Sequence, residues 1–216
     1  KQRKCFMIKK TNDIIKKNFK WIICFICLVI CSLLIEAIFT KEIIQIDNIV
    51  YTFISNHLIN DTITPLIKMI TFLGSATGII ILTIILFLII KNKQQNILLG
   101  ANLCIITLIN QILKYLIMRP RPNIFRIVEE SGYSFPSGHS MVSMAFYGYL
   151  IYLVYKNMKN KYLKWFLIIT LAILIILIGI SRIYLGVHYT TDVLGGFLIS
   201  LSYLIVYTHI TKGIEK

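Results

Sequence analysis

Long apolar runs alternate with short polar segments along the whole chain of 216 residues. A run of about 20 apolar residues spans the roughly 30 Å hydrocarbon core of a bilayer when it forms an α-helix. The pattern therefore predicts an all-α, polytopic membrane protein. We expect six transmembrane helices, over residues 21–40, 65–90, 96–118, 138–155, 165–180 and 193–210.

The first apolar run follows a basic segment, so it could also be a signal peptide. It is long, however, and it lacks a small-residue cleavage site, which favours a membrane span. No linker rich in Pro, Gly or Ser divides the chain. We expect a basic cytoplasmic N-terminal segment (1–20), a single six-helix membrane domain (21–210) and a short cytoplasmic tail (211–216).

Between the first two spans, apolar residues recur at helical spacing, while most polar residues fall elsewhere. The apolar positions are Ile46, Ile49, Val50, Phe53, Ile54 and Leu58, and the polar ones are Asp47, Asn48, Ser55 and Asn56. This pattern predicts a short amphipathic helix that lies on the outer membrane interface. We expect His57 to be a solvated surface residue and assign it no chemistry.

The chain is 57% apolar and 15% charged, yet its net charge is +14. In a soluble protein such a charge suggests a nucleic-acid partner. Here sixteen of the 23 Lys and Arg residues lie in the termini and in alternate loops, where only Asp13 and Glu215 are acidic. Basic loops stay in the cytoplasm, so both termini are predicted to be cytoplasmic and no nucleic-acid partner is expected.

The five cysteines form no disulfide pattern, because three of them lie within the first span. Cys24 and Cys27 have the C-x-x-C spacing, which is a weak metal or redox signal. Thiols that pack as small apolar groups are the favoured interpretation.

Three stretches place charged or polar groups next to predicted spans. Such groups cost free energy near a membrane and are therefore candidates for a functional role. The first is Lys114-x6-Arg121-Pro122, at the end of the third span. Alone, Lys114 could simply extend its ammonium to the membrane surface.

The second stretch, Pro136-Ser137-Gly138-His139, begins the fourth span. A helix N-terminus offers free N–H groups and a positive dipole end, and Gly138 lets an anion approach the backbone. An ordinary capped helix start would have a similar sequence.

The third stretch is Ser181-Arg182-x5-His188-x3-Asp192, at the turn between the last two spans. If His188 and Asp192 share a helical turn, their i,i+4 spacing puts the carboxylate beside the imidazole. The carboxylate would fix the tautomer and leave the other ring nitrogen free to attack. A purely structural His–Asp pair is equally open.

All three stretches fall on the outer side in the topology derived from charge alone. Lys and Arg can neutralise phosphate oxygens, backbone amides add fixed dipoles, and a histidine can attack in line. Together the stretches therefore favour phosphoryl transfer.

In order and spacing, the three stretches resemble the signature of the type 2 phosphatidic acid phosphatase family, in its bacterial integral-membrane branch. The resemblance implies that His188 is the nucleophile, that Asp192 orients it and that His139 protonates the leaving oxygen. It also implies that the phosphoryl group is held by Lys114, Arg121, Ser137, Gly138 and Arg182. Arg119 and Arg126 could contact a second phosphate.

The resemblance further implies a plasma-membrane enzyme with an extracytoplasmic site, a lipid phosphate substrate, no cofactor and no metal. Consistently, Glu129, Glu130 and Asp192 do not form the carboxylate cluster that magnesium requires. No obligatory protein partner is evident. The bilayer and its lipids are the expected partners.

The expected substrate is undecaprenyl diphosphate, with phosphatidylglycerol phosphate or phosphatidic acid as alternatives. A phosphotransferase would use the same residues. Six spans, a basic outer pocket and intramembrane polar groups would also serve a transporter or scramblase of lipid phosphates. It would not need a histidine backed by a carboxylate and a second histidine, which favours the enzyme.

Overall fold

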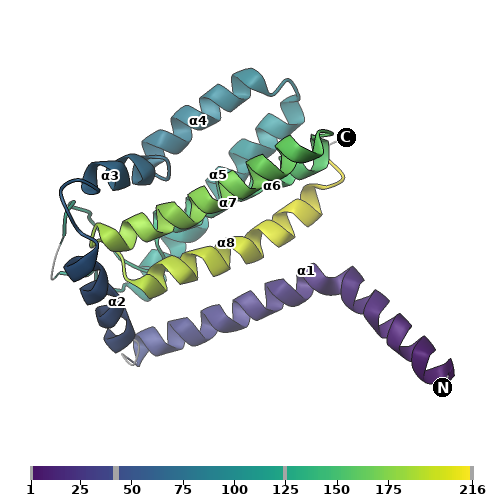
Figure 1. Ribbon diagram of the computed structural model, residues 1–216, viewed down its shortest axis with the longest axis horizontal. Helices are drawn as coiled ribbons and strands as arrows, with labels where there is room; N and C mark the ends of the chain where they lie inside the picture. The colour runs from purple at the N-terminus through teal and green to yellow at the C-terminus, as the bar shows by residue number, and fades with distance from the viewer. Residues whose placement is uncertain (1, 41–43, 124–125, 215–216) are drawn as a thin grey trace.

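The computed structural model describes residues 2–40, 44–123 and 126–214, with side chains from Asn18 onward except Ile44. Residues 215–216 of the predicted tail lie outside the described residues, and Cys5 lies where side chains are not described. Within these ranges the fold is all-α, as predicted (Figure 1). The helices are α1 (Gln2–Phe39), α2 (Ile44–His57), α3 (Thr64–Phe72), α4 (Ala76–Ile89), α5 (Lys93–Ile117), α6 (Gly138–Asn157), α7 (Lys161–Tyr184) and α8 (Thr190–Thr211).

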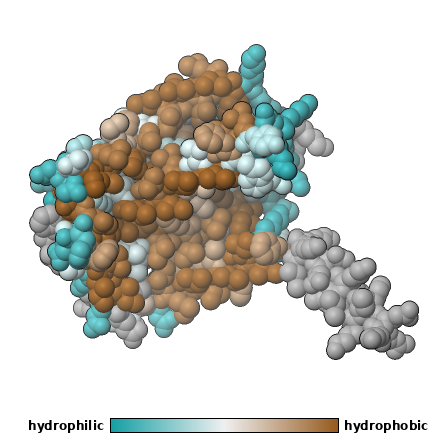
Figure 2. Space-filling view, viewed as in Figure 1, coloured by the Kyte–Doolittle hydropathy of each residue, from teal (hydrophilic) through white to brown (hydrophobic). Residues whose placement is uncertain are grey.

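Among the described residues, four helices are long and apolar enough to cross a membrane, namely α1 from Asn18 onward, α5, α7 and α8. The bent pair α3 and α4 makes a fifth if it is taken as one span. Figure 2 shows the resulting broad apolar band, with hydrophilic groups gathered toward its two ends. The expected fourth span is the helix α6, but it is not among the apolar candidates, so the count of six is not confirmed.

The expected second span, residues 65–90, is divided into two helices whose axes differ by 53°. The cause is local: Ser75 has extended backbone angles (φ −74°, ψ 160°) and therefore leaves the helix. Its hydroxyl accepts a hydrogen bond from the N–H of Gly78 at 3.1 Å, which caps the start of α4.

Gly74, beside the break, lies against α7. A Cβ atom at this position would be 2.4 Å from Cγ2 of Ile178. Real Cβ atoms do not come so close to a neighbour, so only glycine fits at the present separation. The break thus lets the backbone of this span approach α7 beside the first turn of α6, which contains His139.

The core forms around α6, which packs against α5, α7 and α8, while α1 covers the other side of α8. Its largest fully buried side chains include Tyr149, Phe146 and Ile178. In α1 the side chains of Cys24, Cys27 and Cys31 are buried and free, which confirms packing as small apolar groups. Cys104 is exposed.

The helix α2 lies across one end of the bundle, steeply inclined to α1 (Figure 1). We call this the site end, because α5 and α7 finish there and α6 and α8 begin there. α2 contacts α7 and α8. As expected, Ile46, Ile49 and Phe53 form an exposed apolar face and His57 is exposed. Unexpectedly, Asp47 is fully buried.

Candidate active site

The three motif stretches meet at the site end of the bundle. Lys114 lies in the last turn of α5 and Arg182 in the last turn of α7. His139 lies in the first turn of α6 and Asp192 in the first turn of α8. The loop between α5 and α6 carries Arg121 over this end. Helix termini from four elements therefore converge on one small volume.

His188 is 2% exposed, and its two ring nitrogens have different neighbours. Nδ1 is 3.4 Å from Oδ2 of Asp192, and Nε2 is 3.2 Å from Nη1 of Arg121. A proton on Nδ1 faces the carboxylate, which leaves the lone pair of Nε2 directed at the guanidinium. Burial lowers the pKa of His188 to about 4, against the opposing effect of Asp192. The imidazole is therefore neutral at pH 7.

Asp192 is completely buried and its carboxylate is held on both oxygens. Oδ1 accepts a hydrogen bond from Nη1 of Arg119 at 2.6 Å. Oδ2 accepts from the backbone N–H of Tyr189 at 2.8 Å and from the hydroxyl of Ser134. These contacts fix the rotation of the carboxylate, so that Oδ2 faces His188.

Arg121 and Arg182 lie on either side of one carboxylate, Glu130. Arg182 donates to Oε1, and Nη2 of Arg121 is 4.0 Å from Oε2. Burial alone would raise the pKa of Glu130, but the charge and hydrogen bond of Arg182 outweigh it and hold the pKa below its usual range. The carboxylate thus occupies the position that an anionic ligand would take between the two guanidinium groups.

Arg182 is 2% exposed and uses only part of its donor set. Nη1 donates to Oγ1 of Thr71, in the bent span, at 2.9 Å. Its Nε is buried and has no hydrogen-bond partner among the described residues. Because a buried charged donor without a partner is unfavourable, this N–H is a ready contact for an anion's oxygen.

Lys114 donates to the backbone carbonyl of Tyr133 at 2.9 Å. It lies within electrostatic range of Arg121, Asp192 and Arg182. Arg121 itself is fixed by carbonyls of the same loop, donating to Gly132 at 3.0 Å and to Ser131 at 2.9 Å. Lys114 is thus held by a neutral backbone carbonyl, and Arg121 mainly by such carbonyls beside its 4.0 Å contact with Glu130.

Ser137 caps α6. Its hydroxyl accepts a hydrogen bond from Ser140 N at 3.4 Å, and its own N–H donates to Asp192 O. The side chain is therefore engaged in the fold. Gly138 and His139 follow in the first turn, where backbone N–H groups lack intrahelical partners. His139 lies within electrostatic range of Arg182, His188 and Lys114, so the second histidine belongs to the same cluster.

Sequence reasoning missed Asp47, Ser134, Thr71 and Glu130, and it misjudged Arg119. Arg119 was a candidate for a second phosphate, but both of its Nη atoms are bound to carboxylates, those of Asp47 and Asp192. Arg126 is exposed and donates to the carbonyl of Pro122. The only feature of the sequence that marked Arg119 as a candidate was its place in the stretch Arg119-Pro120-Arg121-Pro122.

Among the described residues no three His, Cys, Asp or Glu side chains are grouped so that they could hold a metal ion. The charged groups of the site are instead mainly Lys and Arg.

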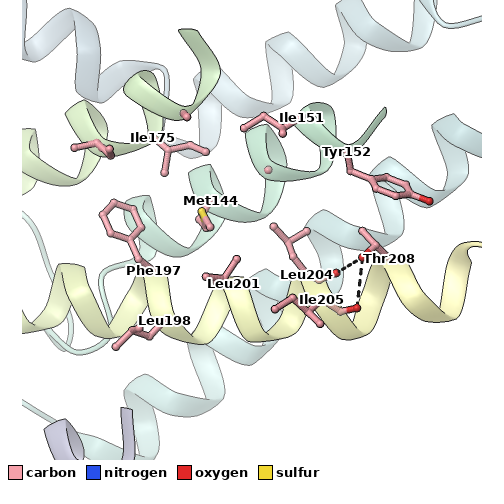
Figure 3. Close-up of a pocket in the computed structure, with 13 residues that line it drawn as sticks. Met144, Ile151, Tyr152, Ile175, Phe197, Leu198, Leu201, Leu204, Ile205 and Thr208 are labelled. Carbon is pink, nitrogen blue, oxygen red and sulfur yellow. Dashed lines mark hydrogen bonds between the residues drawn. The ribbon is translucent and has the colours of Figure 1, made fainter. Parts of the chain in front are cut away.

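An apolar groove with a volume of about 490 Å³ lies between α6, α7 and α8 (Figure 3). Met144 and Leu201 line its middle, Phe197 lies toward one end, and Thr208 lies toward the other with its hydroxyl bonded back to the α8 backbone. Thr208 is sixteen positions after Asp192, which corresponds to about 24 Å along a helix. The groove extends from Phe197, which is five positions after Asp192, along the apolar band and away from the site end.

A family model described as the PAP2 superfamily matches residues 95–215, which is more than half of the chain. Phosphatidylglycerophosphatase B of Bacillus subtilis is 40% identical over 112 residues, which are 50% of this chain and 52% of that protein. The alignment thus spans about half the length of this relative. Undecaprenyl-diphosphatase of Sulfolobus acidocaldarius is 26% identical over 93% of this chain and 96% of its own.

Two solved structures resemble the fold. The crystal structure of a transmembrane PAP2-type phosphatidylglycerolphosphate phosphatase from Bacillus subtilis has a TM-score of 0.82 at 28% identity, covering 89% of this chain and 98% of its own. Aquifex aeolicus LpxE has a TM-score of 0.61 at 24% identity, covering 74% and 93%, and shares the fold.

Proposed function

Since the chain belongs to the PAP2 superfamily, we propose that it is a membrane lipid phosphatase that works through a phosphohistidine at His188. The observation that carries the proposal is the asymmetry of this imidazole. Nδ1 faces Asp192, while Nε2 points toward the guanidinium of Arg121. A nucleophile that faces a cationic pocket is what phosphoryl transfer requires.

In the first step, the lone pair of His188 Nε2 attacks phosphorus and forms a P–N bond. The P–O bond to the lipid breaks, and its electron pair leaves with the lipid oxygen. His139 protonates this oxygen as it departs. Asp192 stabilises the positive charge that develops on the imidazole.

In the second step, water attacks the phosphorus while His139 removes its proton. The P–N electron pair returns to Nε2, and inorganic phosphate is released. A lipid or sugar alcohol that replaced water would make the same site a phosphotransferase.

The substrate's phosphoryl group replaces Glu130 between Arg121 and Arg182. It also satisfies the Nε donor of Arg182, which has no partner among the described residues. Lys114 and the first N–H groups of α6, at Gly138 and His139, complete the binding of its oxygens. Ser137 contributes by capping this helix end.

Undecaprenyl diphosphate is the substrate that we propose, because an outward-facing site suits the recycling of this carrier and a relative that aligns over most of the chain bears that activity in its name. Phosphatidylglycerol phosphate is the second candidate. It is supported by the named activity of the Bacillus subtilis relative and of the solved structure with the TM-score of 0.82.

We further propose that α6 crosses the membrane, which makes six spans. It is 20 residues long and packs lengthwise against α7 and α8, both of which are apolar candidates. Three of its polar residues, Ser140, Ser143 and Tyr149, are buried and face the interior. With six spans and a basic N-terminus, both termini are cytoplasmic and the site end faces outward.

His188→Ala should abolish phosphate release from both lipids, whereas Asp192→Asn should fold normally and lose several orders of magnitude in rate. The purified protein should keep its activity in excess EDTA, because Lys and Arg supply the charge. Phosphate release, and a phosphoenzyme that is labile to acid, are the measurements. Full activity in folded His188→Ala protein contradicts the mechanism. Lipid movement without phosphate release would indicate a transporter.

A further inference from the structure

Asp47 is an acidic residue on the amphipathic helix α2, yet it is 0% exposed. Its neighbours Ile46 and Ile49 are 59% and 68% exposed. This is the reverse of what an isolated surface helix would do, because burial of a carboxylate is unfavourable unless the charge is paired and hydrogen-bonded. The partners of Asp47 must therefore account for its position.

Both oxygens of Asp47 are used, and all their donors belong to the site end. Oδ1 accepts from the backbone N–H of Thr191 at 3.1 Å. Oδ2 accepts from the Thr191 hydroxyl and from Nη2 of Arg119, each at 2.7 Å. Thr191 immediately precedes Asp192, so the carboxylate of α2 holds the first turn of α8.

Arg119 links the two carboxylates. Nη2 contacts Asp47, and Nη1 contacts Oδ1 of Asp192 at 2.6 Å and the Thr191 hydroxyl at 2.7 Å. Its guanidinium also lies over the ring of Tyr189, 4.1 Å from the centroid. Only the planar, forked guanidinium can make these contacts at once, which a lysine ammonium could not.

Building on the proposed function, we infer that Asp47 and Arg119 are positioning residues that aim Asp192 at His188, and that α2 thereby sets the geometry of the nucleophile. Asp47 fixes Arg119, Arg119 fixes Oδ1 of Asp192, and the remaining oxygen of Asp192 faces Nδ1 of His188. Neither residue is part of the proposed phosphate pocket.

Asp47→Asn tests this chain of contacts. An amide has one accepting oxygen and an NH2 group that cannot accept, so the variant must lose either the Thr191 N–H or Arg119. Arg119 is then free to shift toward its other carboxylate, and Asp192 turns away from His188. We expect kcat to fall by about 10- to 100-fold, the range seen when the hydrogen-bond partner of a metal-ligating histidine is removed.

The readout is the split between kcat and KM, measured with purified full-length protein on undecaprenyl diphosphate and phosphatidylglycerol phosphate. Positioning predicts a lower kcat, with KM and competitive inhibition by inorganic phosphate unchanged, because the phosphate pocket is intact. Asp61→Asn is the matched control: Asp61 is an exposed acid just beyond α2, and this change should leave both constants unaltered. Wild-type kcat, or a raised KM alone, in folded Asp47→Asn protein overturns the inference.

If Asp47→Asn does not fold, Arg119→Lys replaces it, since the buried positive charge is kept and only the fork is lost. A reduced kcat at constant KM supports positioning, and full kcat in folded Arg119→Lys protein overturns it. His188→Ala is assayed in parallel. Activity in that variant would sink the phosphohistidine mechanism itself, whereas an inactive His188→Ala beside a fully active Asp47→Asn would sink only the positioning role.

Discussion

At the scale of single residues, the proposed chemistry depends on an imidazole that remains unprotonated although the Asp192 carboxylate lies beside it. Burial lowers the pKa of His188 to about 4, while Asp192 partly opposes the shift. A histidine in a peptide titrates near 6.5. Between these values an unfolded His188 gains a proton and the folded one does not, so the nucleophile should survive mild acid.

We therefore expect His188 to titrate near pH 4 in the folded protein. The ring stays neutral and nucleophilic above that pH. Its nucleophilicity is lost as the pH falls through the pKa, because the ring then gains a proton. The ¹⁵N chemical shifts of histidine-labelled protein, assigned with His188→Ala, would report this directly. A midpoint near 6.5 would contradict the effect of burial. The chemical shifts are measured on the protein alone, so they are not affected by ionisation of the substrate phosphate, which also titrates near pH 6.

The role of His139 can be tested through the leaving group. A monophosphate expels a lipid alkoxide that needs a proton, whereas a diphosphate expels a lipid phosphate that can leave ionised. General acid help is typically worth about 10² to 10⁴ in rate. His139→Ala should therefore keep a larger fraction of its rate on undecaprenyl diphosphate than on phosphatidic acid. Equal fractional losses in single-turnover experiments would make His139 a binding residue instead.

Spacing along the chain paired residues of this site only where they are close in sequence. The grouping of the three motif stretches rested on their common predicted side and on the family resemblance. His188 and Asp192 are four positions apart, so a helical turn was enough to pair them. Asp47 is separated from Arg119 by 72 positions and from Thr191 by 144, and no periodicity relates them. Its contacts depend on how α2 packs on α8, which a pattern along one helix cannot express.

At the scale of elements, hydropathy located every helix of the bundle but not the break between α3 and α4. The apolar run continues through Gly74 and Ser75, so nothing in its composition marks an end. The interruption comes from the cap at Ser75 and from the contact with α7, which are matters of hydrogen bonding and packing. For α6 the sequence predicted a span, but the helix is not among the apolar candidates. It carries several serines and tyrosines, of which Ser140, Ser143 and Tyr149 face the interior.

Gly74→Ala should destabilise the protein by about 1–3 kcal/mol, the usual effect of overpacking, because its methyl group would overlap Ile178. Activity should fall too, because the shift that relieves the overlap with Ile178 would take place beside the ring of His139, whose Cδ2 lies 3.5 Å from the added Cβ. Thermal unfolding in detergent and phosphate release are the measurements.

Gly100→Ala on α5 is the matched control. The added methyl group would lie 3.6 Å from Phe87, an ordinary contact. Alanine is also favoured over glycine in a helix, by about 0.5–1 kcal/mol. We expect unchanged or higher stability and normal activity. Equal effects of the two substitutions would mean that the close approach of Gly74 to α7 is not needed.

At the scale of the whole molecule, the apolar band and the basic termini predict that the site end faces outward. A cysteine introduced by Ser131→Cys should react with a membrane-impermeant thiol reagent in intact cells. Ser131 is exposed, and its contact with Arg121 uses only the backbone carbonyl, so the change should be tolerated. Cys5 should react only after lysis. The reverse pattern would overturn the topology.

The long separations around Asp47 also bear on how the protein is made. Translation and membrane insertion proceed from the N-terminus, so α2 is synthesised long before Arg119 and Thr191, both of which it needs for a buried carboxylate. In the proposed topology, Asp47 would remain hydrated at the outer surface until α8 enters the bilayer. Although α2 is synthesised before α5 and α8, we therefore expect it to dock only after them.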